Sequence, residues 1–175
     1  MNIKITLLEH GPKDIPGYAS KGAAGIDIEA AIKEPIKIDP RERILIPSGF
    51  KIELPINYEA QIRPRSGLAI KHGITVLNSP GTIDSDYRGE VGVILINHSN
   101  QTFIIEPRMR IAQMVICSLP KINLVKANIL SDTERGSDGF GSTGVDNECS
   151  RFYRGRNTTL CPTHNIASSW RNWAA

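Results

Sequence analysis

The sequence has 175 residues, of which 40% are hydrophobic, and a formal net charge of +3 at pH 7. A chain of this length and apolar content is expected to form one domain with a real core, which excludes disorder as its main state. Its apolar runs are far shorter than the roughly 20 residues of a membrane span, so no membrane partner is expected. Residues 145–175 carry four of the 21 basic and two of the 18 acidic residues, which leaves 17 basic against 16 acidic residues in residues 1–144. The main domain therefore has no broad basic face, and nucleic acid is not an expected partner.

The cysteines and the first residues bear on the cellular compartment. Cys117, Cys149 and Cys161 are too few and too irregularly spaced for a disulfide framework or a zinc site. The first ten residues contain no long apolar run, so no secretory signal is expected. Reduced thiols in a cytoplasmic protein are the simplest interpretation of both observations.

Short runs rich in Ile, Val, Leu and Thr make up most of the chain, and Gly, Pro and Asn separate them. In Lys51-Ile52-Glu53-Leu54 the apolar residues fall at every second position, which is typical of a strand with one buried face. The predicted strands are residues 3–8, 25–30, 36–38, 43–46, 50–54, 60–63, 74–77, 89–97, 102–105 and 111–118. Many short strands between turns predict an all-β fold, as a sandwich, jelly roll or barrel.

One short helix is predicted over residues 66–72, and no longer stretch shows a helical period. Ser66 is expected to cap its N-terminus and Gly73 to end it. From Ser131 the chain becomes polar and rich in glycine. We therefore expect a domain of residues 1–130, a flexible arm of residues 131–144, and an unstructured extension of residues 145–175.

The densest group of unusual residues lies between the strands predicted at residues 73–77 and 90–96. We predict a long β-hairpin whose tip turns at Pro80-Gly81 and whose return leg carries Asp84 and Tyr87. Ile83 and Asp84 are neighbours, so one side chain is expected in the core and the other in a cleft. A solvated acidic turn is one interpretation of this segment. The alternative is a general base or a metal ligand, because several carboxylates crowd there.

Two further segments combine glycine with arginine. Residues 63–67 (RPRSG) place two arginines at a strand end and a helix start, an arrangement that suits a phosphate or, alternatively, an ordinary helix cap. Residues 135–144 combine four glycines with Arg135 and Phe140, which suit a phosphate and a base, or a simple linker. Together with the hairpin, these segments fit a nucleoside triphosphate better than any other ligand class.

Five blocks, in this order along the chain, resemble the motifs of the trimeric dUTPase family (deoxyuridine triphosphate nucleotidohydrolases). They are residues 24–28 (AGIDI), 64–68 (PRSGL), 81–89, 110–113 (RIAQ) and 135–144. The resemblance implies a β jelly roll, a homotrimer, and active sites at subunit interfaces that the arm of a neighbouring chain closes. The implied reaction converts dUTP and water to dUMP and pyrophosphate, which provides dUMP for dTTP synthesis and keeps uracil out of DNA.

The resemblance also implies roles for residues near the phosphates. Asp84 would be the catalytic residue that orients and deprotonates the water attacking the α-phosphorus. Arg65, Ser66 and Gly67 would hold the phosphates, with Gln113 nearby. A carboxylate base can approach a triphosphate only when cations balance its charge, so Mg²⁺ is the implied cofactor. In this family phosphate oxygens and waters hold the metal, so no protein ligand to it is predicted.

The nucleoside would be recognised by the hairpin. By the same resemblance, Asn78 and the backbone around Thr82 and Ile83 would read uracil, and Tyr87 would lie under the deoxyribose. A tight hairpin can exclude the 5-methyl group of thymine, and mismatched donors and acceptors would reject cytosine.

The arm would close the site. Arg135 would grip the terminal phosphate and Phe140 would stack on uracil, while Gly139 and Gly141 would let the backbone approach the substrate closely. Ordering of this segment would exclude water from the reaction.

Two residues, Arg108 and Asp138, depart from the family pattern, and a further glycine is common at the position of Asp138 in the last block. The family usually has glycine at the position of Arg108, so the turn before the fourth block can differ from the family's. Asp27 most resembles a structural carboxylate of the first block, behind the residues that touch substrate. Two alternative functions remain open, a dCTP deaminase of the same fold and a catalytically silent binding protein. Tyr87 and Phe140 favour the dUTPase over the deaminase, and Asp84 argues against a silent protein.

Overall fold

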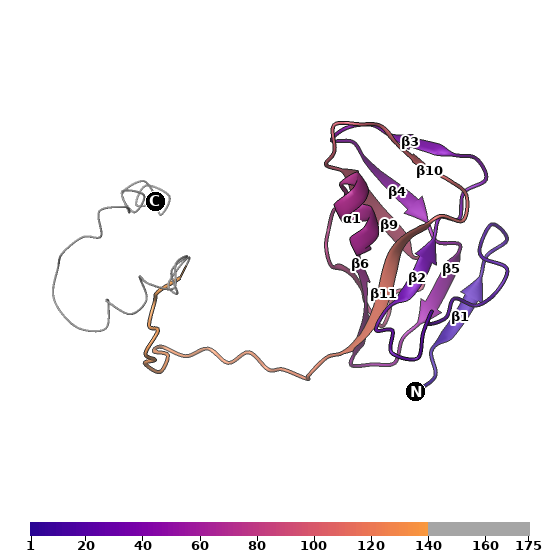
Figure 1. Ribbon diagram of the computed structural model, residues 1–175. Coiled ribbons are helices and arrows are strands. Elements are labelled where there is room, and N and C mark those ends of the chain that lie inside the picture. Colours follow the sequence, from indigo (N-terminus) through magenta and orange to yellow (C-terminus); the bar gives the residue numbers. More distant parts are fainter. Residues whose placement is uncertain (140–175) are drawn as a thin grey trace, which may run out of the picture. The chain divides into compact units, whose positions relative to one another are not determined.

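The computed structural model describes residues 1–139, which contain eleven β-strands and one α-helix (Figure 1). The elements are β1 (Lys4–Leu7), β2 (Ile26–Glu29), β3 (Ile36–Ile38), β4 (Arg43–Pro47), β5 (Phe50–Glu53), β6 (Tyr58–Arg63), α1 (Ser66–His72), β7 (Ile74–Val76), β8 (Gly81–Ile83), β9 (Gly92–Asn97), β10 (Phe103–Ile105) and β11 (Arg110–Ser118). Phe140, Gly141 and the predicted extension of residues 145–175 lie outside the described residues. Within residues 1–139, no helix is long and apolar enough to cross a membrane.

The strands form four small sheets, and every pair within them is antiparallel. The largest has the order β2-β11-β6-β8, and a second has the order β4-β9-β7. The other two sheets are the pairs β1-β5 and β10-β3. The predicted all-β fold with one short helix directly after residues 64–65 is therefore confirmed.

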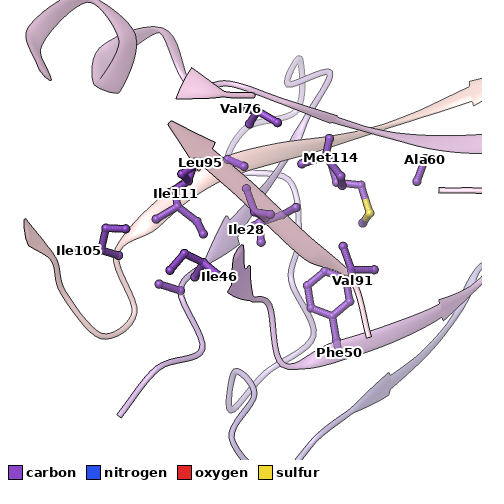
Figure 2. Packing of buried hydrophobic residues seen from close by; sticks show 14 of the residues in the cluster. Ile28, Ile46, Phe50, Ala60, Val76, Val91, Leu95, Ile105, Ile111 and Met114 are labelled. Atoms are coloured by element: carbon purple, nitrogen blue, oxygen red, sulfur yellow. The ribbon is translucent and has the colours of Figure 1, made fainter. Parts of the chain in front are cut away.

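One hydrophobic core joins the four sheets. Figure 2 shows Ile28 of β2, Ile46 of β4, Phe50 of β5 and Ile105 of β10 gathered in it, one from each sheet, and all four are at most 1% exposed. The alternation predicted for residues 51–54 is confirmed, because the chain there is exposed and buried in turn. Each such buried side chain stabilises the fold by roughly 1.5–3 kcal/mol, so the core fixes which strand faces carry the polar residues.

The predicted hairpin is right at its base and wrong at its tip. Strands β7 and β9 pair as expected, with Val76 opposite Leu95. The tip, however, is the separate strand β8, which leaves that sheet and pairs with β6, so that Thr82 lies opposite Gln61. Buried Gly81 allows this close approach, and the pairing satisfies backbone groups of β6 that would otherwise lack partners. A strand of three residues is too short to show a period in the sequence.

The helix covers the predicted residues 66–72, but its N-cap differs from the prediction. Arg65, not Ser66, occupies the N-cap position, with extended backbone (φ −94°, ψ 128°) and no side-chain cap hydrogen bond. Ser66 is the first helical residue, and it is exposed. The C-terminal prediction is confirmed: Gly73 adopts φ 66°, and its N–H donates to the carbonyl of Ala69. The hydroxyl of Ser66 is thus left facing the surface rather than closing the helix.

The chain divides into two compact units, Met1–Asn123 and Leu124–Ala175. All the described residues of the second unit, 124–139, are exposed. A local turn organises the start of the glycine-rich segment: the N–H of Asp138 donates to the carbonyl of Arg135 (3.1 Å), and the Arg135 Nε donates to the carbonyl of Asp138 (2.8 Å). Gly136 takes φ 54° in this turn, a conformation that favours glycine.

Candidate functional site

The largest sheet brings residues of three sequence blocks to one place. Strand β11 lies between β2 and β6, and Gln113 on β11 faces Asp27 on one side and Arg63 on the other. Arg65 lies two residues after the end of β6, and Arg110 begins β11. We call Asp27, Arg65, Arg110 and Gln113 the arginine corner.

A single carboxylate orients both guanidinium groups of the arginine corner. Asp27 Oδ1 lies 3.0 Å from Arg65 Nε, and Asp27 Oδ2 lies 3.3 Å from Arg110 Nη1. Arg65 Nη1 also donates to the carbonyl oxygen of Arg110 (3.0 Å). Such partly exposed pairs stabilise a fold by about 0–1 kcal/mol, so their main effect is to fix the direction of the guanidinium groups. Two arginines and one aspartate leave the corner with one net positive charge, which suits an anion.

Gln113 links the remaining blocks to the corner. Its Nε2 donates to the carbonyl oxygen of Pro64 (3.0 Å). The first block accommodates this amide because it has glycine at position 25, where an added Cβ would lie 2.4 Å from Gln113 Oε1. Ser66 and Gly67 are exposed next to the corner, and a Cβ on Gly67 would meet nothing within 4 Å. The predicted phosphate-binding residues are therefore close in the fold, with open space beside them.

The segment after β8 borders a cavity of about 280 Å³, the hairpin cavity. Its lining residues are Leu45, Thr82, Ile83, Asp84, Tyr87, Glu90, Gly92 and Ile94. Ile83 is half-buried and packs against the core, while Asp84 is exposed. The predicted division between the core and a cleft holds only in part, because Ile83 lines the same cavity as Asp84. The Asp84 carboxylate is in contact with solvent there.

Tyr87 is held in place by its own loop. Its hydroxyl donates to the carbonyl of Glu90 (2.9 Å), and its N–H donates to the carbonyl of Asp84 (3.2 Å). A Cβ on Gly89 would lie 2.2 Å from the Tyr87 hydroxyl, so the ring packs directly on that glycine. The residue is nevertheless 43% exposed. It is thus a fixed aromatic surface at the hairpin cavity.

Strand β8 forms the edge of its sheet, because β6 is its only neighbour among the described strands. Its outer backbone groups, around Thr82, can therefore pair with a ligand. Asn78 contributes an amide here: a Cβ on Gly81 would lie 3.2 Å from Asn78 Nδ2, so the glycine lets this amide approach the strand. The edge of β8 offers the alternating donors and acceptors that a planar nucleobase requires.

Arg108 occupies a left-handed position in the turn before β11. It adopts φ 65°, its N–H donates to the carbonyl of Ala30 (2.9 Å), and the N–H of Met109 donates to Glu106 (3.0 Å). Its guanidinium donates to the carbonyls of His10 (3.3 Å) and Gly11. The turn therefore does not depend on glycine, and the arginine side chain ties it to the N-terminal loop.

The structure brings the predicted residues together as two groups. Arg65, Ser66, Gly67 and Gln113 form one group, and the residues of β8 and its loop form the other. None of the residues that line the hairpin cavity belongs to the arginine corner. Arg135 and Gly139 belong to the second compact unit and are exposed.

Sequence reasoning assigned no role to two residues that the structure makes prominent. Arg110 shares the carboxylate of Asp27, and Glu90 accepts the Tyr87 hydroxyl. The only signal for Arg110 was its place at the start of the fourth block.

Eleven antiparallel strands in four sheets and one short helix define an all-β domain within the described residues. Its backbone superposes on that of the Staphylococcus bacteriophage 80alpha dUTPase with dUpNHpp, with a TM-score of 0.74 and 26% identity over 82% of this chain and 99% of that one. A dUTPase from phage phi11 of S. aureus, described with a structural Mg(II) ion, gives a TM-score of 0.67 at 21% identity, over 75% of this chain and 100% of that one. These matches confirm the predicted jelly-roll fold.

Sequence comparison identifies the family. The dUTPase family model matches residues 12–144. The deoxyuridine 5'-triphosphate nucleotidohydrolase of Chlamydia pneumoniae is 61% identical over 133 residues, 75% of this chain and 92% of that protein. The corresponding enzyme of Rickettsia akari is 57% identical over 143 residues, 82% of this chain and 97% of that protein. The chain belongs to the dUTPase family, a family of nucleotide hydrolases.

Proposed function

We propose that this chain hydrolyses dUTP to dUMP and pyrophosphate, with Asp84 as the general base. The observation that carries the proposal is the exposed Asp84 carboxylate at the hairpin cavity, next to the edge of β8 and the fixed ring of Tyr87. A carboxylate so placed can orient a water molecule and accept its proton as the water attacks the α-phosphorus. In a cell this reaction would provide dUMP for dTTP synthesis and keep uracil out of DNA.

In this proposal the hairpin recognises the nucleoside. Uracil pairs with the outer edge of β8 around Thr82 and Ile83, and with the amide of Asn78. The deoxyribose lies on the ring of Tyr87, where a ribose 2′-hydroxyl would collide. This binding edge rejects a wrong base because a mismatched base leaves buried polar groups without hydrogen-bond partners.

The arginine corner binds the phosphates. The Asp27 carboxylate already fixes the guanidinium of Arg65, so little side-chain freedom is lost when an anion binds. Ser66 and Gly67 add a hydroxyl and open backbone beside it. Gln113, held against Pro64, completes this side of the site. Arg135, Gly139, Phe140 and Gly141 of the arm would then cover the phosphates and the base.

A magnesium ion fits this site together with the substrate. Residues 1–139 contain no group of three or more His, Cys, Asp or Glu side chains that could hold a metal, and the Asp27 carboxylate is shared by two arginines. Magnesium keeps several waters and binds readily through phosphates. The triphosphate would carry the ion, which would neutralise charge and so let the Asp84 carboxylate approach.

The separation of the two groups supports a homotrimer with shared sites. A substrate that touches both Asp84 and Arg65 must lie between subunits if these residues do not meet within one chain. Large apolar side chains are available for such an interface: Leu45, at the hairpin cavity, is 64% exposed, and Ile70 on α1 is 83% exposed. Exposed apolar side chains that gather into one patch mark sites of protein association.

The activity is tested by measuring pyrophosphate release from dUTP, dTTP, dCTP and UTP. We expect dUTP to be the preferred substrate, and Asp84→Asn to bind it normally while losing turnover by several orders of magnitude. Asp86→Asn, an exposed carboxylate two residues away, is the matched control and should keep most activity. Equal turnover in the Asp84→Asn variant would refute the general base, and ammonia release from dCTP would indicate a deaminase.

The shared site is tested by mixing two inactive variants. Asp84→Asn and Arg65→Ala chains are unfolded together and refolded. Mixed trimers contain some sites that combine an intact Asp84 with an intact Arg65, so activity should return. Refolding each variant alone gives the baseline. No recovery in mixtures that form trimers would show that each site lies within one chain.

A further inference from the structure

We infer that Glu90 is a positioning residue that sets the place of the Tyr87 ring and thereby the discrimination between deoxyribose and ribose, an inference that rests on the proposed function. The main chain of Glu90 accepts the Tyr87 hydroxyl (2.9 Å). The ring therefore moves with the backbone of this residue. The contacts that hold Glu90 therefore also set the position of the Tyr87 ring, the surface on which the deoxyribose is proposed to lie.

The Glu90 side chain is held by residues outside the Tyr87 loop. Its Oε1 accepts the backbone N–H of Gly49 (2.7 Å) and lies 2.9 Å from His10 Nε2. An ionised carboxylate has no proton to give, so His10 is the donor in this contact. The Glu90 and His10 side chains are only 28% and 35% exposed. Hydrogen bonds to a charged acceptor are stronger than neutral ones, and partial burial protects them from water.

Both partners of the carboxylate are themselves rigid. The carbonyl of Gly49 accepts the N–H of Leu8 (2.8 Å), and the N–H of Gly11 donates to the carbonyl of Leu8 (2.8 Å). Gly11 lies so close to Gly49 that a Cβ on Gly11 would be 2.0 Å from the Gly49 carbonyl oxygen. The His10 carbonyl is held by Arg108. Glu90 thus connects the Tyr87 loop to a part of the fold that has little room to move.

The inference predicts that removing the carboxylate loosens the ring without destroying the fold. Glu90→Ala loses both bonds, whereas Glu90→Gln keeps an oxygen that can accept from Gly49. We expect the ratio of kcat/KM for dUTP to that for UTP to fall about tenfold in Glu90→Ala and to stay within about twofold of the original in Glu90→Gln. Selectivity for dUTP over dCTP should hold in both, because β8 reads the base.

Asn97→Ala is the matched control, because it breaks a buried hydrogen-bond network elsewhere. It should lower thermal stability without changing the ratio of kcat/KM for dUTP to that for UTP.

Fluorine NMR of protein labelled with 3-fluorotyrosine observes the Tyr87 ring independently of any enzymatic activity. The chain has four tyrosines, and Tyr87→Phe assigns the signal, which should shift or broaden in Glu90→Ala alone.

An unchanged Tyr87 signal and an unchanged sugar ratio in Glu90→Ala would overturn the inference. So would an equal loss of the ratio in Asn97→Ala, which would show that general destabilisation is the cause. Failure of the unsubstituted protein to hydrolyse dUTP would refute the proposed function instead, and the NMR comparison would still decide whether Glu90 places the ring.

Discussion

Replacement of Arg108 by glycine and by alanine separates backbone strain from side-chain contacts. Both substitutions remove the hydrogen bonds from the guanidinium to the carbonyls of His10 and Gly11. They differ in how easily the new residue adopts the φ of 65° at this position. Any difference in stability between the two variants therefore reports the cost of the left-handed backbone.

The expected magnitude follows from that conformation. An L-residue pays roughly 1–2 kcal/mol in the left-handed region, and glycine does not. At ordinary positions glycine is instead about 0.5–1 kcal/mol less stable than alanine. We expect Arg108→Gly to be more stable than Arg108→Ala by about 1 kcal/mol, which is about 2–4 °C in Tm for a chain of this size. Against the original protein, the glycine variant should be nearly neutral, because relief of strain offsets the lost hydrogen bonds.

The assay is urea denaturation at one fixed protein concentration, which keeps the comparison independent of the proposed assembly. The same pair of substitutions at Lys51, an exposed residue of β5, is the control, and there alanine should be the more stable. If alanine at position 108 equals or exceeds glycine, backbone strain at this turn is not a significant cost and the reasoning fails.

Two other predictions concern packing. Gly25→Ala should push the Gln113 amide away from Pro64 and lower kcat/KM for dUTP about tenfold. Gly22→Ala is the control, because a Cβ there would meet nothing within 4 Å, and it should leave kcat/KM unchanged. Asn97→Ala should lower the free energy of unfolding by about 2–4 kcal/mol. The reason is that the fully buried Asn97 amide donates to the carbonyls of Ile38 and Gln101 and accepts from Ser99. Denaturant titration measures this loss, and a value below about 0.5 kcal/mol would contradict the prediction.

The strands were predictable where burial alternates along enough residues. The chain at residues 51–54 shows this pattern, and β5 lies there. Strand β8 was not predictable, because three residues carry no period and its partner β6 lies some twenty positions away in the chain. Ser66 was assigned the cap because of its residue type, yet the extended backbone of Arg65 places the N-cap one residue earlier, and Ser66 is the first helical residue.

The sequence motifs indicated which residues belong to the candidate site, but they did not indicate how these residues are arranged in space. The sequence shows two arginines around Pro64, and nothing in their spacing tells which one faces Asp27. Strand β6 ends at Arg63, whose guanidinium turns back to Gln61 Oε1 (2.6 Å), and this leaves Arg65 for the carboxylate. The anchor of Tyr87 joins residues as far apart as His10 and Glu90. Such contacts depend on the tertiary fold, which local patterns do not encode.

The outward edge of β8 consists of peptide groups, and every amino acid supplies the same ones. A point substitution at Thr82 changes the side chain and leaves this row of donors and acceptors intact. In the proposed function, a shift in the accepted nucleobase would therefore need a different path of the main chain, through an insertion or deletion near Asn78. Fidelity toward the base is in this way protected from most single-codon changes.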